Sequence, residues 1–208
     1  MKYGNVTGVS KPISRLVQGT GSYDPAEPDA MFESLDLAFE IGFNTFDTAQ
    51  VYGAERERVF GRWIRERGIR DKVNILAKGA HHSDRPRVTP EDITTDLTNT
   101  LEHMQVDFVE LYLLHRDNPA VPVGPIVEIL NEHHQAGRIG AFGGSNWRWQ
   151  RVAEANEYAK AHGLIPFAVS SPNFSLAEQV EEPWDNCVSI GGPKGQALAK
   201  VRFRRALV

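Results

Sequence analysis

Four side chains that are widely separated along the chain could together move a proton onto an oxygen atom. They are Asp47, Tyr52, Lys78 and His115. A phenol can donate its proton to an oxygen on which negative charge develops, and a nearby ammonium favours the phenolate that remains. A carboxylate keeps a buried ammonium charged, and a neutral imidazole can donate a hydrogen bond to the same oxygen. These four residue types therefore suit the protonation of a forming alkoxide, if the fold brings them together.

Each of these residues lies at or just beyond the carboxyl end of a short apolar segment that predicts a buried strand. The three segments span residues 43–47, 73–78 and 108–114. Asp47 and Lys78 end the first two segments, His115 directly follows the third, and Tyr52 lies on the connection after Asp47. Taken singly, Asp47 could form a turn, Lys78 could lie at the surface and His115 could be a core histidine. Their shared position at strand ends favours a common site.

The rest of the chain alternates between strands and helices at intervals of roughly 30 residues. Further strands are predicted at residues 12–21, 139–144 and 165–170. Helices are predicted at residues 29–41, 54–67, 89–104, 126–135 and 149–162. Helix-length connections between successive strands imply parallel strands joined by right-handed crossovers. No linker interrupts the pattern, so residues 1–208 are expected to form a single domain.

Two architectures are built in this way, an open doubly wound sheet and a closed (β/α)8 barrel of the TIM type. The doubly wound dinucleotide fold carries Gly-x-Gly-x-x-Gly after its first strand. Here the turn Gly19-Thr20-Gly21 lacks the third glycine, because Asp24 occupies its position. A barrel active site instead draws ionisable residues from the carboxyl ends of several strands, where the four residues above are predicted. We therefore predict an α/β protein of the TIM-barrel type.

The composition describes an ordinary globular chain and excludes several classes of function. Of the 208 residues, 41% are hydrophobic and 24% are charged, which is enough for a sizeable core. The net charge of −4 offers no basic excess to neutralise phosphates, so nucleic-acid binding is not expected. No run approaches the roughly 20 apolar residues of a membrane span. Cys187 is the only cysteine, which fits a cytoplasmic protein without disulfides.

The chain contains two adjacent histidine pairs, and histidine is a common metal ligand. His81-His82 and His133-His134 do not have the i, i+4 spacing that directs two imidazoles from a helix at one metal ion. A single cysteine cannot form a cysteine-based zinc site either. We predict no metal site.

The order and spacing of four motifs resemble those of the aldo-keto reductase family. The motifs run from Asn44 to Gly53, from Leu76 to Lys78, from Leu113 to Arg116 and from Gly143 to Trp147. The resemblance extends over roughly residues 13 to 193. It implies a TIM-barrel oxidoreductase that uses NADPH to reduce an aldehyde or ketone to an alcohol, with Tyr52 as the proton donor.

The resemblance also implies a set of cofactor-binding residues. They would be Gly19, Thr20, Ser145, Asn146, Ser171 and Phe174. Ser145 and Asn146 would hold the nicotinamide carboxamide, although the same two residues could simply cap the following helix. Ser171 stands near where the family often has a glutamine, and Phe174 could stack where the family often has a tyrosine.

The substrate implied by the resemblance is a small carbonyl compound. Tyr23 and Trp147 would form walls of its pocket. Aromatic residues at such positions are also often packing residues, so both interpretations remain open.

The chain departs from the family at its carboxyl end. It passes six predicted strands and ends at Val208, whereas a complete barrel takes about 250 residues. The phosphate site of such barrels commonly comes from the connections after the last two strands, so it is expected to be missing. The last stretch, Gln196 to Arg205, is basic and helix-capable, and does not resemble the family. We expect a truncated barrel of about six βα units, with an open edge through which two copies could self-associate.

Three functions remain open for this chain. The first is an NADPH-dependent carbonyl reductase, which rests on the four ionisable residues. The alternative is a catalytically inactive reductase-like scaffold that acts as an interaction or regulatory protein, which rests on the missing carboxyl-terminal part. A doubly wound dehydrogenase or epimerase is the third, and it requires the glycine fingerprint that this chain lacks.

Overall fold

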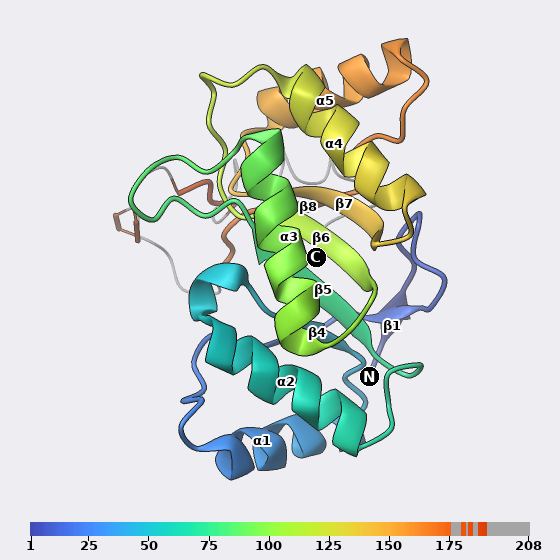
Figure 1. The fold of residues 1–208 in the computed structure, drawn as a ribbon, viewed down its shortest axis with the longest axis vertical. Helices are drawn as coiled ribbons and strands as arrows, with labels where there is room; N and C mark the ends of the chain where they lie inside the picture. Colours follow the sequence, from blue (N-terminus) through green and yellow to red (C-terminus); the bar gives the residue numbers. More distant parts are fainter. Residues whose placement is uncertain (176–179, 182, 185–186, 191–208) are drawn as a thin grey trace.

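The computed structural model describes residues 1–175, 180–181, 183–184 and 187–190. Its centre is one sheet of six parallel strands in the order β3-β4-β5-β6-β7-β8. The strands are β3 (Gln18–Gly19), β4 (Thr45–Asp47), β5 (Asn74–Gly79), β6 (Val109–Leu114), β7 (Ile139–Ser145) and β8 (Val169–Ser171). The sheet is curled, and the helices lie around its outer face (Figure 1). This is a partial TIM barrel, so the predicted fold class is confirmed.

Five helices return the chain from each strand to the start of the next. They are α1 (Pro28–Glu40), α2 (Ala54–Glu66), α3 (Pro90–Met104), α4 (Val123–Gln135) and α5 (Trp149–Ala161). Helix α3 begins where the sequence predicts it, because the Thr89 hydroxyl accepts a hydrogen bond from the Asp92 amide at 3.2 Å. Helix α4 begins at Val123, three residues before the predicted start at residue 126. Pro125 fits there because first-turn amides have no partner within the helix.

The two faces of the sheet have different surroundings. Every residue of β5 is buried, since helices cover the outer face and the curled sheet encloses the inner one. Outward-pointing Ile75 and Ala77 join the large core between sheet and helices. Inward-pointing Leu76 joins a smaller apolar cluster with Leu111 of β6 and other interior residues. Ionisable groups at the carboxyl ends therefore stand above an apolar interior.

An amino-terminal hairpin closes the opposite end of this interior. Strands β1 (Tyr3–Gly4) and β2 (Ile13–Ser14) pair antiparallel in a separate two-stranded sheet. The apolar side chains of Val6 and Ile13 pack into the inner cluster. The prediction of one strand over residues 12–21 was wrong, because Ile13 and Ser14 belong to this hairpin and only Gln18–Gly19 joins the parallel sheet.

The last described strand is also shorter than predicted. The sequence predicted a strand at 165–170, but β8 covers only Val169–Ser171. Side chains from neighbouring helices occupy the backbone of the preceding residues: Asn131 binds both the amide and the carbonyl of Ile165. Asn156 does the same for Phe167. These backbone groups are therefore not available to a strand ladder.

Within the described residues, no helix is long and apolar enough to cross a bilayer. The basic carboxyl-terminal stretch that the sequence analysis singled out, Gln196 to Arg205, lies outside the described residues.

Candidate functional site

The structure brings Asp47 and Lys78 into direct contact at the carboxyl end of the sheet. Both residues point into the interior, from neighbouring strands β4 and β5. The Lys78 Nζ atom donates a hydrogen bond to Asp47 Oδ2 and forms an ion pair with it. The side chains are only 8% and 16% exposed, so the pair is largely removed from water. An ammonium is thereby held at the mouth of the interior.

Tyr52 completes this group from the connection after β4. It ends a short 3-10 helix, η1 (Gln50–Tyr52), which turns the chain back over the end of the sheet. Its ring centroid lies 5.9 Å from the Lys78 Nζ atom. The ring of His115 meets it edge-on, at a centroid distance of 6.1 Å and an angle of 86°. The four ionisable residues predicted from the sequence are thus neighbours in space.

Gly21 determines how closely the chain can approach the Tyr52 ring. A β carbon at Gly21 would lie 3.1 Å from the Cζ atom of Tyr52, the carbon that bears the hydroxyl, and 3.3 Å from Cε2. A β carbon at this position would therefore press on the ring, which would have to shift to make room. From the sequence, Gly21 was predicted only to be part of a turn, because this contact joins two different strand-to-helix connections.

The electrostatics of the group follow from burial. Burial raises the pKa of Asp47, while the charge of Lys78 acts in the opposite direction. Burial also lowers the pKa of His115 to about 2, with further contributions from the positive charges of Lys78 and Arg116. His115 is therefore neutral at physiological pH. Its Nδ1 atom is buried and has no hydrogen-bond partner among the described residues.

A cleft of about 390 Å³ opens beside these residues. Tyr52, Lys78 and His115 line one part of it. The remaining lining residues come mainly from the ends of β6, β7 and β8 and from the segment after β8: Arg116, Ser145, Asn146, Ser171, Pro172, Asn173, Phe174 and Trp184. Four of the six predicted cofactor residues therefore line the same cleft as Tyr52, Lys78 and His115, which together we call the proton-transfer group.

Backbone contacts fix the polar residues at the ends of β7 and β8. The Ser145 hydroxyl and the Asn146 amide both donate to the Ser171 carbonyl, at 3.1 and 3.2 Å. Asn146 has a φ of 56°, in the left-handed region that asparagine tolerates better than most residues. The side-chain Nδ2 atom of Asn173 is buried without a partner among the described residues. A ligand that carries an amide or another acceptor would satisfy this donor.

The structure does not place the other predicted site residues in the lining of this cleft. Trp147 is 1% exposed and packs in the helix-side core, against the Phe167 ring at 5.2 Å. Tyr23 packs against the same core, and its hydroxyl accepts a hydrogen bond from Gln18 at 3.1 Å. Gly19 is the last residue of β3, and Thr20 follows it, fully buried.

Four residues of the cleft lining were not predicted from the sequence as site residues: Arg116, Pro172, Asn173 and Trp184. Arg116 stands within a motif that was recognised, directly after His115. Asn173 and Trp184 lie after β8, where the short polar and aromatic residues give no periodic signal. Position next to a strand end could have identified Arg116, whereas only the tertiary structure brings Trp184 to the cleft.

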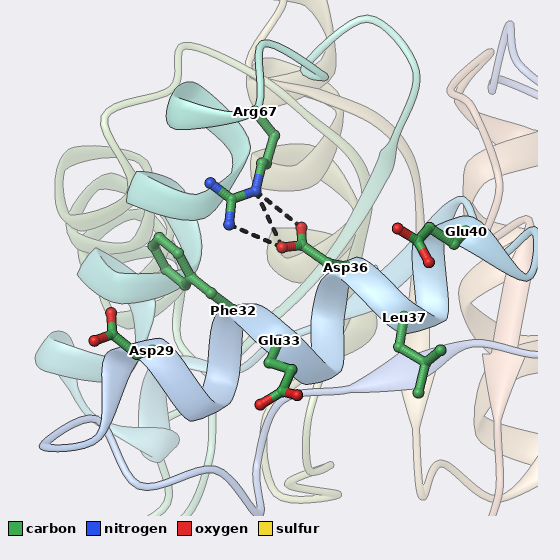
Figure 2. A pocket seen from close by; sticks show the side chains of 7 residues that line it. All are labelled: Asp29, Phe32, Glu33, Asp36, Leu37, Glu40 and Arg67. Carbon is green, nitrogen blue, oxygen red and sulfur yellow. Dashed lines mark hydrogen bonds and ion pairs between the residues drawn. The ribbon is translucent and has the colours of Figure 1, made fainter.

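A second hollow, of about 470 Å³, lies on the outer side of α1 (Figure 2). Its centre is an ion pair in which the Arg67 guanidinium binds both oxygens of Asp36. Hydrogen bonding to Arg67 lowers the pKa of Asp36. The Trp63 indole also donates to Asp36, at 2.8 Å. These contacts join α1 to α2, so this hollow has a structural explanation.

The chain matches the family model described as "Aldo/keto reductase family" over residues 15–186. It is 28% identical over 181 residues to aldo-keto reductase YhdN of Bacillus subtilis, covering 80% of this chain and 53% of the relative. It is 27% identical over 172 residues to a chloroplastic pyridoxal reductase of Arabidopsis thaliana, covering 77% of this chain and 46% of the relative.

Two further similarities complete the comparison. A putative voltage-gated potassium channel subunit beta of Schizosaccharomyces pombe is 27% identical, over 77% of this chain and 48% of the relative. The crystal structure of the thermostable aldo-keto reductase Tm1743 with the inhibitor epalrestat superposes with a TM-score of 0.69 at 26% identity, covering 82% of this chain and 61% of that chain. The chain thus spans about half the length of the curated relatives it matches.

Proposed function

The chain belongs to the aldo/keto reductase family, and we propose that it reduces an aldehyde or ketone to an alcohol with a hydride from NADPH. One observation carries the proposal: the Lys78–Asp47 ion pair lies beside Tyr52 and neutral His115 at the end of one cleft. Carbonyl reduction requires a proton donor beside the carbonyl oxygen, and this group of residues can provide one.

Tyr52 is the proposed proton donor. When a hydride adds to the carbonyl carbon, negative charge develops on the oxygen, and the phenol of Tyr52 transfers its proton to that oxygen. The Lys78 ammonium, 5.9 Å from the ring centroid, stabilises the phenolate that remains. Asp47 acts through Lys78, because its carboxylate keeps the ammonium charged in a site with little water.

His115 is proposed to orient the carbonyl. A neutral imidazole has one N–H donor and one acceptor nitrogen, and the pKa of about 2 keeps His115 in this form. Its N–H can therefore donate to the carbonyl oxygen without competing with Tyr52 for the role of acid. Stabilisation of the developing charge by such a preorganised donor is a common component of catalysis.

The residues at the ends of β7 and β8 fit a nicotinamide cofactor. A bound NADPH supplies the hydride. Asn146 and the unpartnered amide of Asn173 offer donors for the carboxamide, and Ser145 and Ser171 are the hydroxyl residues beside them. Phe174 is 54% exposed in the cleft lining, so its ring is available for stacking. The preference for NADPH over NADH and a cytoplasmic location are part of the proposal.

Two measurements on the 208-residue chain test the proposal. A fluorescence titration should show NADPH binding in the micromolar range, and NADPH should then be oxidised when an aldehyde is added. Failure to bind the cofactor at millimolar concentration would refute the proposed activity for this chain.

A second candidate is a non-catalytic interaction protein on the same scaffold. It is favoured by the likeness to the putative voltage-gated potassium channel subunit beta. Among the described residues, strands β3 and β8 form the two edges of the six-stranded sheet, and sheet edges readily pair with other chains. This candidate predicts self-association in sedimentation experiments together with the absence of NADPH binding.

A further inference from the structure

Arg116 is held at the cleft by its own backbone. It follows His115, whose amide donates to the Gly79 carbonyl of β5 at 2.7 Å. The Arg116 carbonyl accepts a hydrogen bond from the Trp147 indole at 3.1 Å. The buried Trp147, which the sequence analysis assigned to the substrate pocket, thus anchors a residue that lines the cleft. Arg116 is therefore half-buried at a fixed place beside the proton-transfer group.

The guanidinium of Arg116 makes a single hydrogen bond among the described residues. Its Nη1 atom donates to the His115 carbonyl at 2.9 Å, and the group lies over the Trp184 ring at 5.7 Å. Among the described residues, no carboxylate lies within ion-pair distance of it. The next residue differs, since Asp117 is paired with Arg151 at 3.3 Å. A guanidinium has five N–H donors and stays charged at physiological pH, so most of the hydrogen-bonding capacity of Arg116 remains for a ligand.

The charge of Arg116 dominates the cleft. Lys78 is the other cationic lysine or arginine in its lining, and Asp47 compensates that charge. His81 and His82 lie close by, and burial and the charge of Arg116 lower the pKa of both. Neutral imidazoles bring no further charge to this side of the cleft. The electrostatic potential at this part of the cleft favours an anion.

We infer that the carbonyl substrate carries an anionic group, in the simplest case a carboxylate, which the Arg116 guanidinium binds while the carbonyl lies beside Tyr52. This inference rests on the proposed function for the carbonyl part of the ligand. A planar guanidinium binds a carboxylate through two parallel hydrogen bonds, which suits a fixed orientation. The same chemistry could bind a phosphate of the cofactor, so the test must separate the two sources.

The kinetic test uses matched substrates. Glyoxylate, 4-oxobutanoate and 4-formylbenzoate carry a carboxylate at increasing distance from the aldehyde, and each is compared with its neutral primary amide. For at least one pair, Arg116→Gln should raise the KM of the anionic aldehyde by roughly 10- to 100-fold and change that of the amide less than about threefold. In Arg116→Lys the KM of the anionic aldehyde should lie between those of the wild type and Arg116→Gln, since lysine keeps the positive charge but lacks the paired N–H donors of a guanidinium. Arg148→Gln removes an exposed arginine outside the cleft lining and should change neither KM.

The binding test does not depend on turnover. Calorimetry should show that the wild-type chain binds benzoate at least about fivefold more tightly than benzamide, and Arg116→Gln should abolish this preference. Circular dichroism checks that the variants are folded. If the chain reduced no aldehyde but kept this preference, the proposed function would fail and the anion site would stand. Equal binding of benzoate and benzamide, or an NADPH dissociation constant at least about tenfold higher in Arg116→Gln with the substrate preference unchanged, would overturn the inference.

Discussion

The Lys78 ammonium on β5 is paired with the Asp47 carboxylate on the neighbouring strand β4, and both side chains are more than four-fifths buried. Separating two charges in such a site is costly, because each would lose its partner without regaining full hydration. The pair therefore couples the stability of the barrel end to the electrostatics of the cleft.

Replacement of Lys78 by methionine should destabilise the fold through Asp47. The remaining buried carboxylate would lack its partner, so Lys78→Met is expected to lower the free energy of unfolding by about 3 kcal/mol. The double variant Asp47→Asn, Lys78→Met removes both charges and should recover at least half of this loss. Urea denaturation of the wild type, Asp47→Asn, Lys78→Met and the double variant measures the coupling. Additive losses in the double variant would show that the two side chains do not interact.

A methyl group at Gly21 should impair turnover more than stability. The added β carbon would lie 3.1 Å from the hydroxyl-bearing carbon of Tyr52 and displace the ring. Since small misplacements of a reacting group are costly, Gly21→Ala is expected to lower kcat at least about tenfold. Gly4→Ala is the matched control, because a β carbon there meets no atom within 4 Å. Unchanged kcat in Gly21→Ala would argue against a precisely positioned Tyr52 hydroxyl.

The neutral state of His115 should make the fold less stable in mild acid. Its pKa is about 2 in the folded protein, against 6.5 for an ordinary histidine, so between these pH values the unfolded chain binds more protons. The contribution of neutral His115 to the free energy of unfolding is fully present above pH 6.5. It declines as the pH falls, and at pH 5 it is smaller by roughly 1 to 2 kcal/mol. Denaturation midpoints at pH 7.5 and 5 should differ less in His115→Gln than in the wild type. The exposed His162 offers a control, and an identical pH dependence in His115→Gln would contradict this prediction.

Glu110 should matter for stability but not for the chemistry. At the amino-terminal end of β6 its carboxylate accepts hydrogen bonds from Lys11, Arg70 and the Ile75 amide, and its side chain is 5% exposed. Glu110→Ala is expected to cost about 3 kcal/mol of folding free energy and to leave kcat of the folded protein unchanged. Thermal unfolding and turnover below the transition measure both effects. Glu102→Ala, at an exposed position, serves as the control.

The parts of the fold that repeat were predictable from the sequence. Six strands alternate with helices of ordinary length, and this pattern predicted parallel strands. The ionisable residues at several strand ends then favoured the barrel, in which neighbouring strands follow one another along the chain. Because parallel strands end on the same side, Asp47, Lys78 and His115 had to meet at one end. Tyr52 reaches the same end, because it lies only five positions after Asp47.

Other parts depend on contacts between distant segments that leave no pattern in the sequence. The hairpin of β1 and β2 has two-residue strands, too short for a periodic signal. Helices α2 and α3 approach at Gly61, where a β carbon would lie 2.2 Å from the Met104 carbonyl oxygen. Trp147 could be a pocket wall or a packing residue by its sequence, and the structure places it in the core, where its indole donates to the Arg116 carbonyl. Gly61 and Trp147 each meet a partner that lies tens of residues away along the chain, which single-sequence reasoning cannot pair.

The most direct test of the proposed chemistry is the turnover number of Tyr52→Phe with NADPH and an aldehyde that the wild-type chain reduces. The variant lacks only the hydroxyl, so the NADPH dissociation constant and the unfolding midpoint should stay close to those of the wild type. Loss of the proton donor should lower kcat by at least about 100-fold. A variant that retained kcat within about threefold of the wild type would contradict the assignment of Tyr52 as the proton donor.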